Sequence, residues 1–129
     1  MHKDGAFVVA WSSFTHPDSV YDIKARLYKN NSPITSEFIV NTTTAHSQTN
    51  HDVAVDSQGG FIIVWDSWYQ DGSDRGVFAQ RFDKDGKKTG AEFQVNTTAI
   101  YSQARPAIEV LADDRILVTW ESWNQDDAD

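Results

Sequence analysis

The stretch Phe61-Ile62-Ile63-Val64-Trp65 decides the fold class of this chain, because an unbroken apolar run that ends at a turn signal predicts a β-strand buried on both faces. Residues 7–11 and residues 116–120 are apolar runs of the same kind, and each also ends in tryptophan. The three tryptophans lie 54 and 55 residues apart along the chain. We therefore predict an all-β protein built from a tandem repeat of about 55 residues.

Other blocks recur in the same order at nearly the same offset. The matching pairs are residues 25–28 with 79–82, residues 37–43 with 92–98, and Ser47-Gln48 with Ser102-Gln103. We divide a single domain, residues 1–129, into copy one (4–58), copy two (59–113) and a partial copy three (114–129).

Each repeat is predicted to hold four strands, which we name A to D in chain order. Strand A alternates apolar and polar residues (51–55 and 107–111), which is typical of a half-buried strand. Strand B is the apolar run. Strands C (23–28 and 77–82) and D (37–43 and 92–98) complete the repeat. The order along the chain is B-C-D, A-B-C-D, A-B, which makes nine strands.

Short polar segments between these strands predict antiparallel pairing. Residues 57–60 and Asp113-Asp114 join A to B as tight hairpins, and Asp85-Gly86 is a strong hairpin signal between C and D. Residues 30–33 form the corresponding turn in the first copy. The D-to-A connections, residues 42–50 and 97–105, are long, and we expect them to carry the chain from one sheet to the next.

A four-stranded sheet with a two-faced apolar strand must stack against other copies, which is the pattern of β-propeller blades. The repeat resembles the blade-like tandem repeats of large bacterial secreted and cell-surface proteins. The resemblance is carried by residues 59–65, Gln70-Asp71-Gly72, residues 79–82 and residues 92–98. It implies propeller-type blades and a secreted or cell-surface location. The first copy departs from the pattern, because residues 14–18 stand where residues 68–72 stand later.

The strand order predicts one full blade and two partial blades whose missing strands are complementary. Residues 107–111 of one chain are then expected to pair with the B-C-D strands of another, so that shared blades close a homo-oligomeric ring. Two alternatives stay open at this point, a fragment of a longer protein and a monomeric sandwich of nine strands.

Composition narrows the classes of partner. The net charge of −8 argues against nucleic acids and anionic membranes, because both attract basic surfaces. The absence of cysteine excludes disulfides and thiolate zinc sites. The first residues lead directly into an apolar strand and do not resemble a signal peptide, so export would require a signal outside them.

The B-to-C loops, residues 66–74 and 121–129, are the candidate binding segments. Aromatic residues beside carboxylates suit a sugar, and oxygen-rich loops with glycine suit calcium. The alternative is a solvated loop whose polar side chains bond their own backbone. The candidate ligand-binding residues are Trp68, Tyr69, Asp71, Asp74, Trp123 and Asp126. The candidate calcium ligands are Asp71 and Asp74.

No catalytic motif is present, and no Gly-x-Ser-x-Gly elbow occurs. We therefore expect a non-enzymatic β-propeller-like module for binding or assembly. The alternatives are a lectin-like carbohydrate binder that uses the B-to-C loops and, less favoured, a hydrolase that uses loop carboxylates.

Overall fold

A computed structural model describes residue 2 and residues 4–15, 20–70, 74–97 and 102–123. Throughout these residues the regular elements are all β-strands, so the prediction of an all-β protein is confirmed. No helix suited to crossing a membrane occurs in the same residues. The strands are β1 (Ala6–Thr15), β2 (Val20–Lys29), β3 (Ser32–Pro33), β4 (Phe38–Ile39), β5 (Gln48–Val55), β6 (Phe61–Trp68), β7 (Arg75–Phe82), β8 (Lys88–Gln94), β9 (Gln103–Val110) and β10 (Ile116–Ser122).

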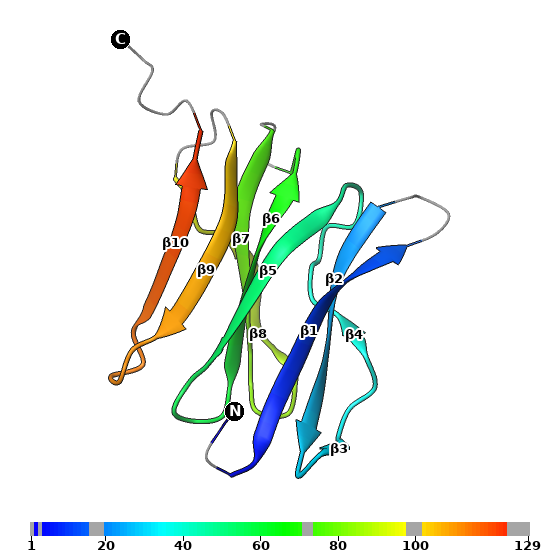
Figure 1. Cartoon of the computed structure of the whole chain (residues 1–129), viewed down its shortest axis with the longest axis vertical. Coiled ribbons are helices and arrows are strands. Elements are labelled where there is room, and N and C mark those ends of the chain that lie inside the picture. The colour runs from blue at the N-terminus through cyan, green and yellow to red at the C-terminus, as the bar shows by residue number, and fades with distance from the viewer. Residues whose placement is uncertain (1, 3, 16–19, 71–73, 98–101, 124–129) are drawn as a thin grey trace.

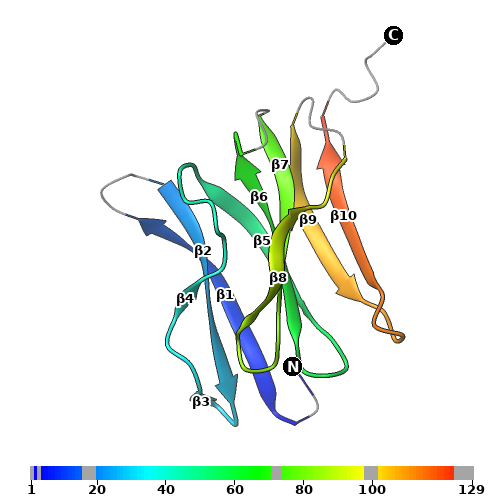
Figure 2. The ribbon, with the colours of Figure 1, turned by 180° about the vertical axis from the view of Figure 1, so that it is seen from behind.

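The strands form three antiparallel sheets that lie in an open row (Figures 1 and 2). The middle sheet is a four-stranded meander in the order β5-β6-β7-β8. In the first sheet β1 pairs with β2, and β3 and β4 both pair with the other edge of β2. The last sheet is the β9-β10 hairpin. The middle sheet thus has neighbours on both of its faces.

Strand D of the first copy differs from the prediction, because residues 37–43 do not form one continuous strand. Of this segment only Phe38–Ile39 is a strand, β4, and a second short strand, β3, lies in the segment predicted as a turn. Both pair with β2, so the described residues hold ten strands rather than nine. Between them the Thr35 hydroxyl accepts a hydrogen bond from the Leu27 amide (3.1 Å), and the Thr35 carbonyl accepts one from Arg26 Nε (2.8 Å). These contacts of Thr35 replace backbone pairing with β2 between β3 and β4.

The two A strands begin earlier than predicted, at Gln48 in β5 and at Gln103 in β9. In β5 the pairing with β6 shifts register between Thr49 and Asp52, which marks a bulge. Asn50 in this bulge has φ 50°, and Arg105 in β9 has φ 53°. A bulge in a polar segment breaks the alternation of apolar and polar residues, so the sequence pattern indicated a loop there.

The core lies on both faces of β6, as the apolar run predicts. Phe61, Ile63 and Trp65 pack toward the first sheet, together with Ile23, Ala25, Leu27 and Val40. Ile62 and Val64 pack toward the last sheet. All five residues of the run are at most 2% exposed. The equivalent runs in β1 and β10 are buried on one face only, since Val9 is 42% exposed and Leu117 is 50% exposed.

One turn occurs three times, once before each B strand. Its two ends are joined by a backbone hydrogen bond from His2 to Ala6 (2.7 Å), from Asp56 to Gly60 (2.9 Å) and from Leu111 to Arg115 (2.8 Å). The fourth residue of each turn adopts a left-handed conformation, with φ 82° at Gly5, 85° at Gly59 and 64° at Asp114. Glycine and aspartate tolerate this region better than bulky residues do, which explains their place in the turns.

Buried polar contacts recur at the same offset. The indole N–H of Trp65 donates to Gln48 Oε1 (3.0 Å), and that of Trp120 donates to Gln103 Oε1 (3.2 Å). The Asn41 side chain accepts from the Ile23 amide, and the Asn96 side chain accepts from the Val77 amide, both at 2.8 Å. These bonds tie the end of each strand D to strand C, and each strand A to the tryptophan of strand B.

We predict that replacing tryptophan by phenylalanine lowers the free energy of unfolding more at position 65 than at the equivalent position 120. Trp65→Phe leaves the buried Gln48 oxygen without its donor and opens a gap between sheets, so it should lower the free energy of unfolding by about 2–4 kcal/mol. Trp120→Phe should lower it by less than about 1 kcal/mol, because Trp120 is 37% exposed. Urea unfolding measures both values, and equal losses would contradict this description of the core.

Candidate functional site

The end of the molecule at which the B strands finish carries an aromatic residue in every copy. Trp68 lies at the end of β6, Trp123 directly follows β10, and Phe14 takes the equivalent place in β1. The Trp68 amide donates to the Ser47 carbonyl, and the Trp123 amide donates to the Ser102 carbonyl, both at 3.0 Å. These bonds fix the backbone of Trp68 and Trp123 against the start of the neighbouring A strand.

An open hollow of about 400 Å³ lies at this end, and we name it the aromatic hollow. It is lined by Val20, Tyr21, His46, Ser47, Thr49, Trp68 and Tyr69. The ring of Tyr69 is 5.6 Å from the His46 ring, edge to face, and 6.0 Å from the Trp68 ring. Tyr69 is 56% exposed and Tyr21 is 41% exposed, so both rings are accessible to a ligand.

Trp68 is less accessible than its sequence position suggests. The guanidinium of Arg75 lies 4.8 Å from the centre of the indole ring, within the range of a cation–π contact. The same guanidinium is 3.9 Å from the carboxylate of Asp66. One face of Trp68 is therefore covered, and the tyrosines offer the open ring surface.

Tyr69 has φ 59°, a conformation that a bulky side chain seldom adopts. Its amide donates to the Asp74 carbonyl (3.0 Å), and its ring packs against His46 and Trp68. Strained backbone of this kind persists where surrounding contacts hold it, and it is concentrated at functional sites.

Asp66 was predicted to lie in the B-to-C loop, and the structure corrects this. Asp66 is within β6 and fully buried. Its carboxylate accepts hydrogen bonds from the Thr49 hydroxyl, the Asn50 side chain (2.8 Å) and the Arg105 amide (3.0 Å). These contacts and that with Arg75 connect β6 with β5, β7 and β9, so Asp66 has a structural role.

The structure brings together only some of the predicted site residues. Trp68 and Tyr69 share the aromatic hollow, and exposed Asp74 contributes its carbonyl to the Tyr69 amide. Trp123 is 48% exposed and lies on the last sheet. Asp71 and Asp126 lie outside the described residues, so the proposed calcium pair stays a prediction. The described residues contain no cluster of three or more His, Asp or Glu side chains suited to a metal.

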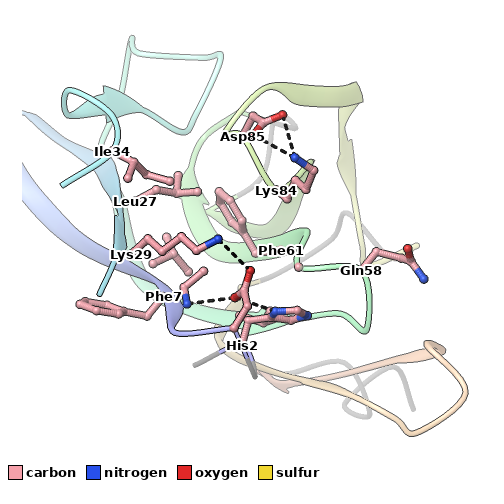
Figure 3. Close-up of a pocket in the computed structure, with 14 residues that line it drawn as sticks. His2, Phe7, Leu27, Lys29, Ile34, Gln58, Phe61, Lys84 and Asp85 are labelled. Atoms are coloured by element: carbon pink, nitrogen blue, oxygen red, sulfur yellow. Dashed lines mark hydrogen bonds and ion pairs between the residues drawn. The ribbon is translucent and has the colours of Figure 1, made fainter. Parts of the chain in front are cut away.

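A second cavity, of about 360 Å³, lies between the first and middle sheets near the turns that precede the B strands (Figure 3). We name it the intersheet cavity. Val8 and Leu27 of the first sheet and Val55 and Phe61 of the middle sheet form its apolar wall. Its charged rim consists of Asp4, Lys29, Lys84 and Asp85.

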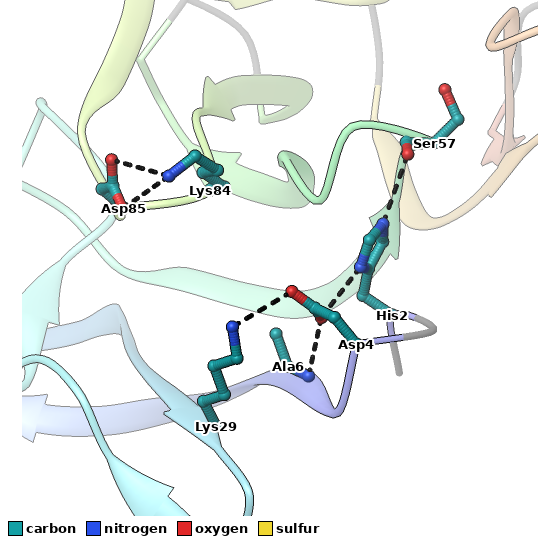
Figure 4. A network of polar contacts seen from close by, with 7 residues as sticks. All are labelled: His2, Asp4, Ala6, Lys29, Ser57, Lys84 and Asp85. Atoms are coloured by element: carbon teal, nitrogen blue, oxygen red, sulfur yellow. Dashed lines mark hydrogen bonds and ion pairs between the residues drawn. The ribbon is translucent and has the colours of Figure 1, made fainter.

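A polar network borders this cavity and joins the two sheets (Figure 4). Asp4 contacts His2 Nδ1 (2.9 Å), accepts from the Ala6 amide (3.1 Å) and pairs with Lys29 Nζ (3.4 Å). The other ring nitrogen of His2 contacts the Ser57 carbonyl (3.2 Å). The hydrogen bond with His2, followed by that with Ala6, lowers the pKa of Asp4 to about 2.

The network continues from the middle sheet to the last sheet. Ser57 donates its amide (2.9 Å) and its hydroxyl to the carboxylate of Asp114. These bonds hold the pKa of Asp114 below its usual value, with the hydroxyl as the larger cause. His2, Ser57 and Asp114 thus connect the three equivalent turns across all three sheets.

Comparison with protein-family models, with curated proteins and with solved structures finds no match for this chain.

We predict that His2→Ala raises the pKa of Asp4 from about 2 toward the ordinary value of 3.8, measured by NMR titration of the carboxyl carbon. A folded-state pKa below the unfolded value stabilises the fold above pH 3.8, and this contribution is lost as the pH falls through about 2. When the pH falls from 3.8 to about 2, the free energy of unfolding of His2→Ala should therefore decrease less than that of the unsubstituted protein. As a control, Ser57→Ala should raise the pKa of Asp114 but leave that of Asp4 unchanged. An unaltered Asp4 titration in His2→Ala would contradict the assignment.

Proposed function

We propose that this chain is a non-enzymatic assembly module whose sheets are propeller-type blades that stack head to tail with other copies. One observation carries the proposal. The two outer sheets expose the same two kinds of face that pack against each other inside the molecule.

The internal contacts show how the faces match. At the first interface Val8 and Ala10 of β1 pack against the cluster that contains Phe61 and Ile63 of β6. At the second interface Ile62 of β6 packs in the cluster that includes Ile116 and Val118 of β10. Each B strand thus uses alternate residues for the preceding sheet and for the following sheet.

The same alternation defines the two outer faces. Phe7, Val9 and Trp11 of β1 point away from the middle sheet and correspond to residues 61, 63 and 65 of β6. Leu117 and Thr119 of β10 point away on the other side and correspond to residues 62 and 64. The outer face of β10 in one copy is therefore suited to the outer face of β1 in another. Such heterologous contacts form a ring when the rotation closes.

Face stacking fits the strand pairing better than the strand sharing expected from the sequence. Within the last sheet β9 is paired with β10, for example Ile108 with Val118. In the first sheet β1 already occupies the B position next to β2. In the predicted order strand A pairs with strand B through the edge that β9 already uses for β10, so placing β9 next to β1 in that way would require β10 to leave.

The location proposed for this module is the cell surface or the exterior of a bacterium. It rests on the resemblance of residues 59–98 to blade-like repeats of large secreted and cell-surface proteins.

Sedimentation equilibrium tests the assembly. The chain should have a mass of at least twice the 14.5 kDa of one chain. Val9→Lys and Leu117→Lys should each return it to the mass of one chain, because a lysine would be buried in the new interface. Ile34→Lys is the control and should leave the mass of the assembly unchanged. Ile34 is as exposed as Leu117, but it lines the intersheet cavity and not an outer face. A single-chain mass at all concentrations of the unsubstituted protein would refute the proposal.

Carbohydrate binding at the aromatic hollow is a second candidate function, and the exposed rings of Tyr21 and Tyr69 favour it. A flat aromatic face can stack on the apolar face of a sugar ring, and polar groups of His46, Ser47 and Thr49 line the same hollow. Open aromatic surface beside hydrogen-bonding groups is the combination that sugar recognition needs.

A glycan array followed by calorimetry tests this second function. Tyr69→Ala should weaken the binding of any sugar found by at least tenfold, since it removes the more exposed of the two tyrosine rings. Phe93→Ala is the matched control, because Phe93 is an exposed aromatic residue on β8, outside the hollow. Equal effects of the two substitutions, or an array without a ligand, would exclude sugar binding there.

A further inference from the structure

We propose that the intersheet cavity binds a small amphiphile, namely an anionic head group on a short apolar chain or ring. A medium-chain carboxylate is the simplest molecule of this class. This site is independent of the proposed stacking, because the cavity lies within one chain and its walls are inner faces of the sheets.

The size and walls of the cavity suit an apolar group. A volume of about 360 Å³ is within the range of small-molecule pockets, roughly 300–1,000 Å³. Leu27 and Phe61 of the wall are 3% and 2% exposed and belong to the core cluster, so the wall of the cavity is the edge of the core. Figure 3 shows Leu27 and Ile34 on one side of the space and Phe61 directed into it.

Two lysines on the rim come from opposite sheets. Lys29 ends β2 of the first sheet, and Lys84 lies in the turn between β7 and β8 of the middle sheet. Their partners are Asp4 at 3.4 Å and the adjacent Asp85 at 3.3 Å. All four side chains are 46–70% exposed, and exposed pairs of this kind contribute little to stability. The lysines can therefore turn to a ligand at small cost.

The rim favours an anion over a cation. Asp4 is already contacted by His2 Nδ1, the Ala6 amide and Lys29 Nζ, which use three of the roughly four acceptor sites of its carboxylate (Figure 4). Each lysine ammonium carries three N–H donors, which allows it to keep its aspartate and hold a second anionic oxygen. An anionic head group at the mouth would thus receive donors from both sheets.

A second hollow, on the middle sheet, has different chemistry. It is lined by residues of the middle sheet and its turns alone, among them Ile62, Arg81, Asp83, Lys84 and Thr89. By the repeat alignment, Arg81 stands where Leu27 stands in the first interface, and Asp83 stands where Lys29 stands. Arg81 thus replaces an apolar residue of the wall and Asp83 replaces one rim lysine, so this hollow does not reproduce the intersheet cavity, although Lys84 lines both.

Isothermal calorimetry with octanoate tests the proposal. Octanoate should bind the intact chain, and Lys84→Glu should weaken binding at least tenfold by reversing the charge at the mouth. Lys87→Glu makes the same charge change in the same turn outside the cavity, and it should alter affinity less than twofold. Octanol, which lacks the anionic head, should bind at least tenfold more weakly than octanoate.

The position of the bound molecule is tested by amide NMR. Octanoate should shift the signals of Val8, Val55 and Gly59, which line the cavity, and leave those of Arg81 and Thr89 unchanged. Absence of binding at millimolar octanoate, equal effects of Lys84→Glu and Lys87→Glu, equal affinity for octanol, or shifts confined to Arg81 and Thr89 would each overturn the proposal.

Discussion

The packing of β6 between two other sheets is the contact on which the rest of the structure depends. Its five-residue apolar run is at most 2% exposed, and it directs side chains into two separate clusters. One sheet alone covers only one face of such a strand, so the chain has to supply a sheet on each side. The open row of three sheets is the smallest arrangement that buries β6 completely.

Polar contacts set how the sheets lie against one another. The Asp52 carboxylate accepts from the Ile108 amide (2.9 Å) and so links β5 with β9. His51 Nε2 contacts the Ala10 carbonyl (3.0 Å) and links β5 with the unpaired edge of β1. Apolar packing is tolerant of sliding, whereas hydrogen bonds have directional geometry, so these contacts define the register between sheets.

The sequence predicted those features that depend on neighbours along the chain. The apolar runs located the B strands, and Asp-Gly and Gly-Gly located the turns. The bulged start of β5 was missed because Thr49, Asn50 and Asp52 break the alternation. Strand D of the first copy was predicted too long and β3 was missed, because the contacts of Thr35 with β2, which separate β3 from β4, arise only after folding.

The residues of the candidate sites also divide into those that are visible in one segment of the sequence and those that come together only in the folded chain. Trp68 and Tyr69 were identified because an aromatic pair beside acids is visible in one segment. Tyr21 and His46 were missed, since they reach the aromatic hollow from segments far away in the chain. The intersheet cavity was missed because its character depends on Leu27 facing Phe61 across two sheets. The difference between Leu27 and Arg81 in the repeat alignment was the one available signal.

Chemical crosslinking tests most directly whether the two outer faces meet. The chain has no cysteine, so the double variant Val9→Cys/Leu117→Cys carries thiols only on these faces. The middle sheet separates them within one chain, by about 20 Å at a sheet spacing of about 10 Å. A bismaleimide too short to span that distance should therefore join different copies, and we predict a ladder of covalent multimers on a denaturing gel. A single band at the mass of one chain, with both thiols modified, would contradict the account.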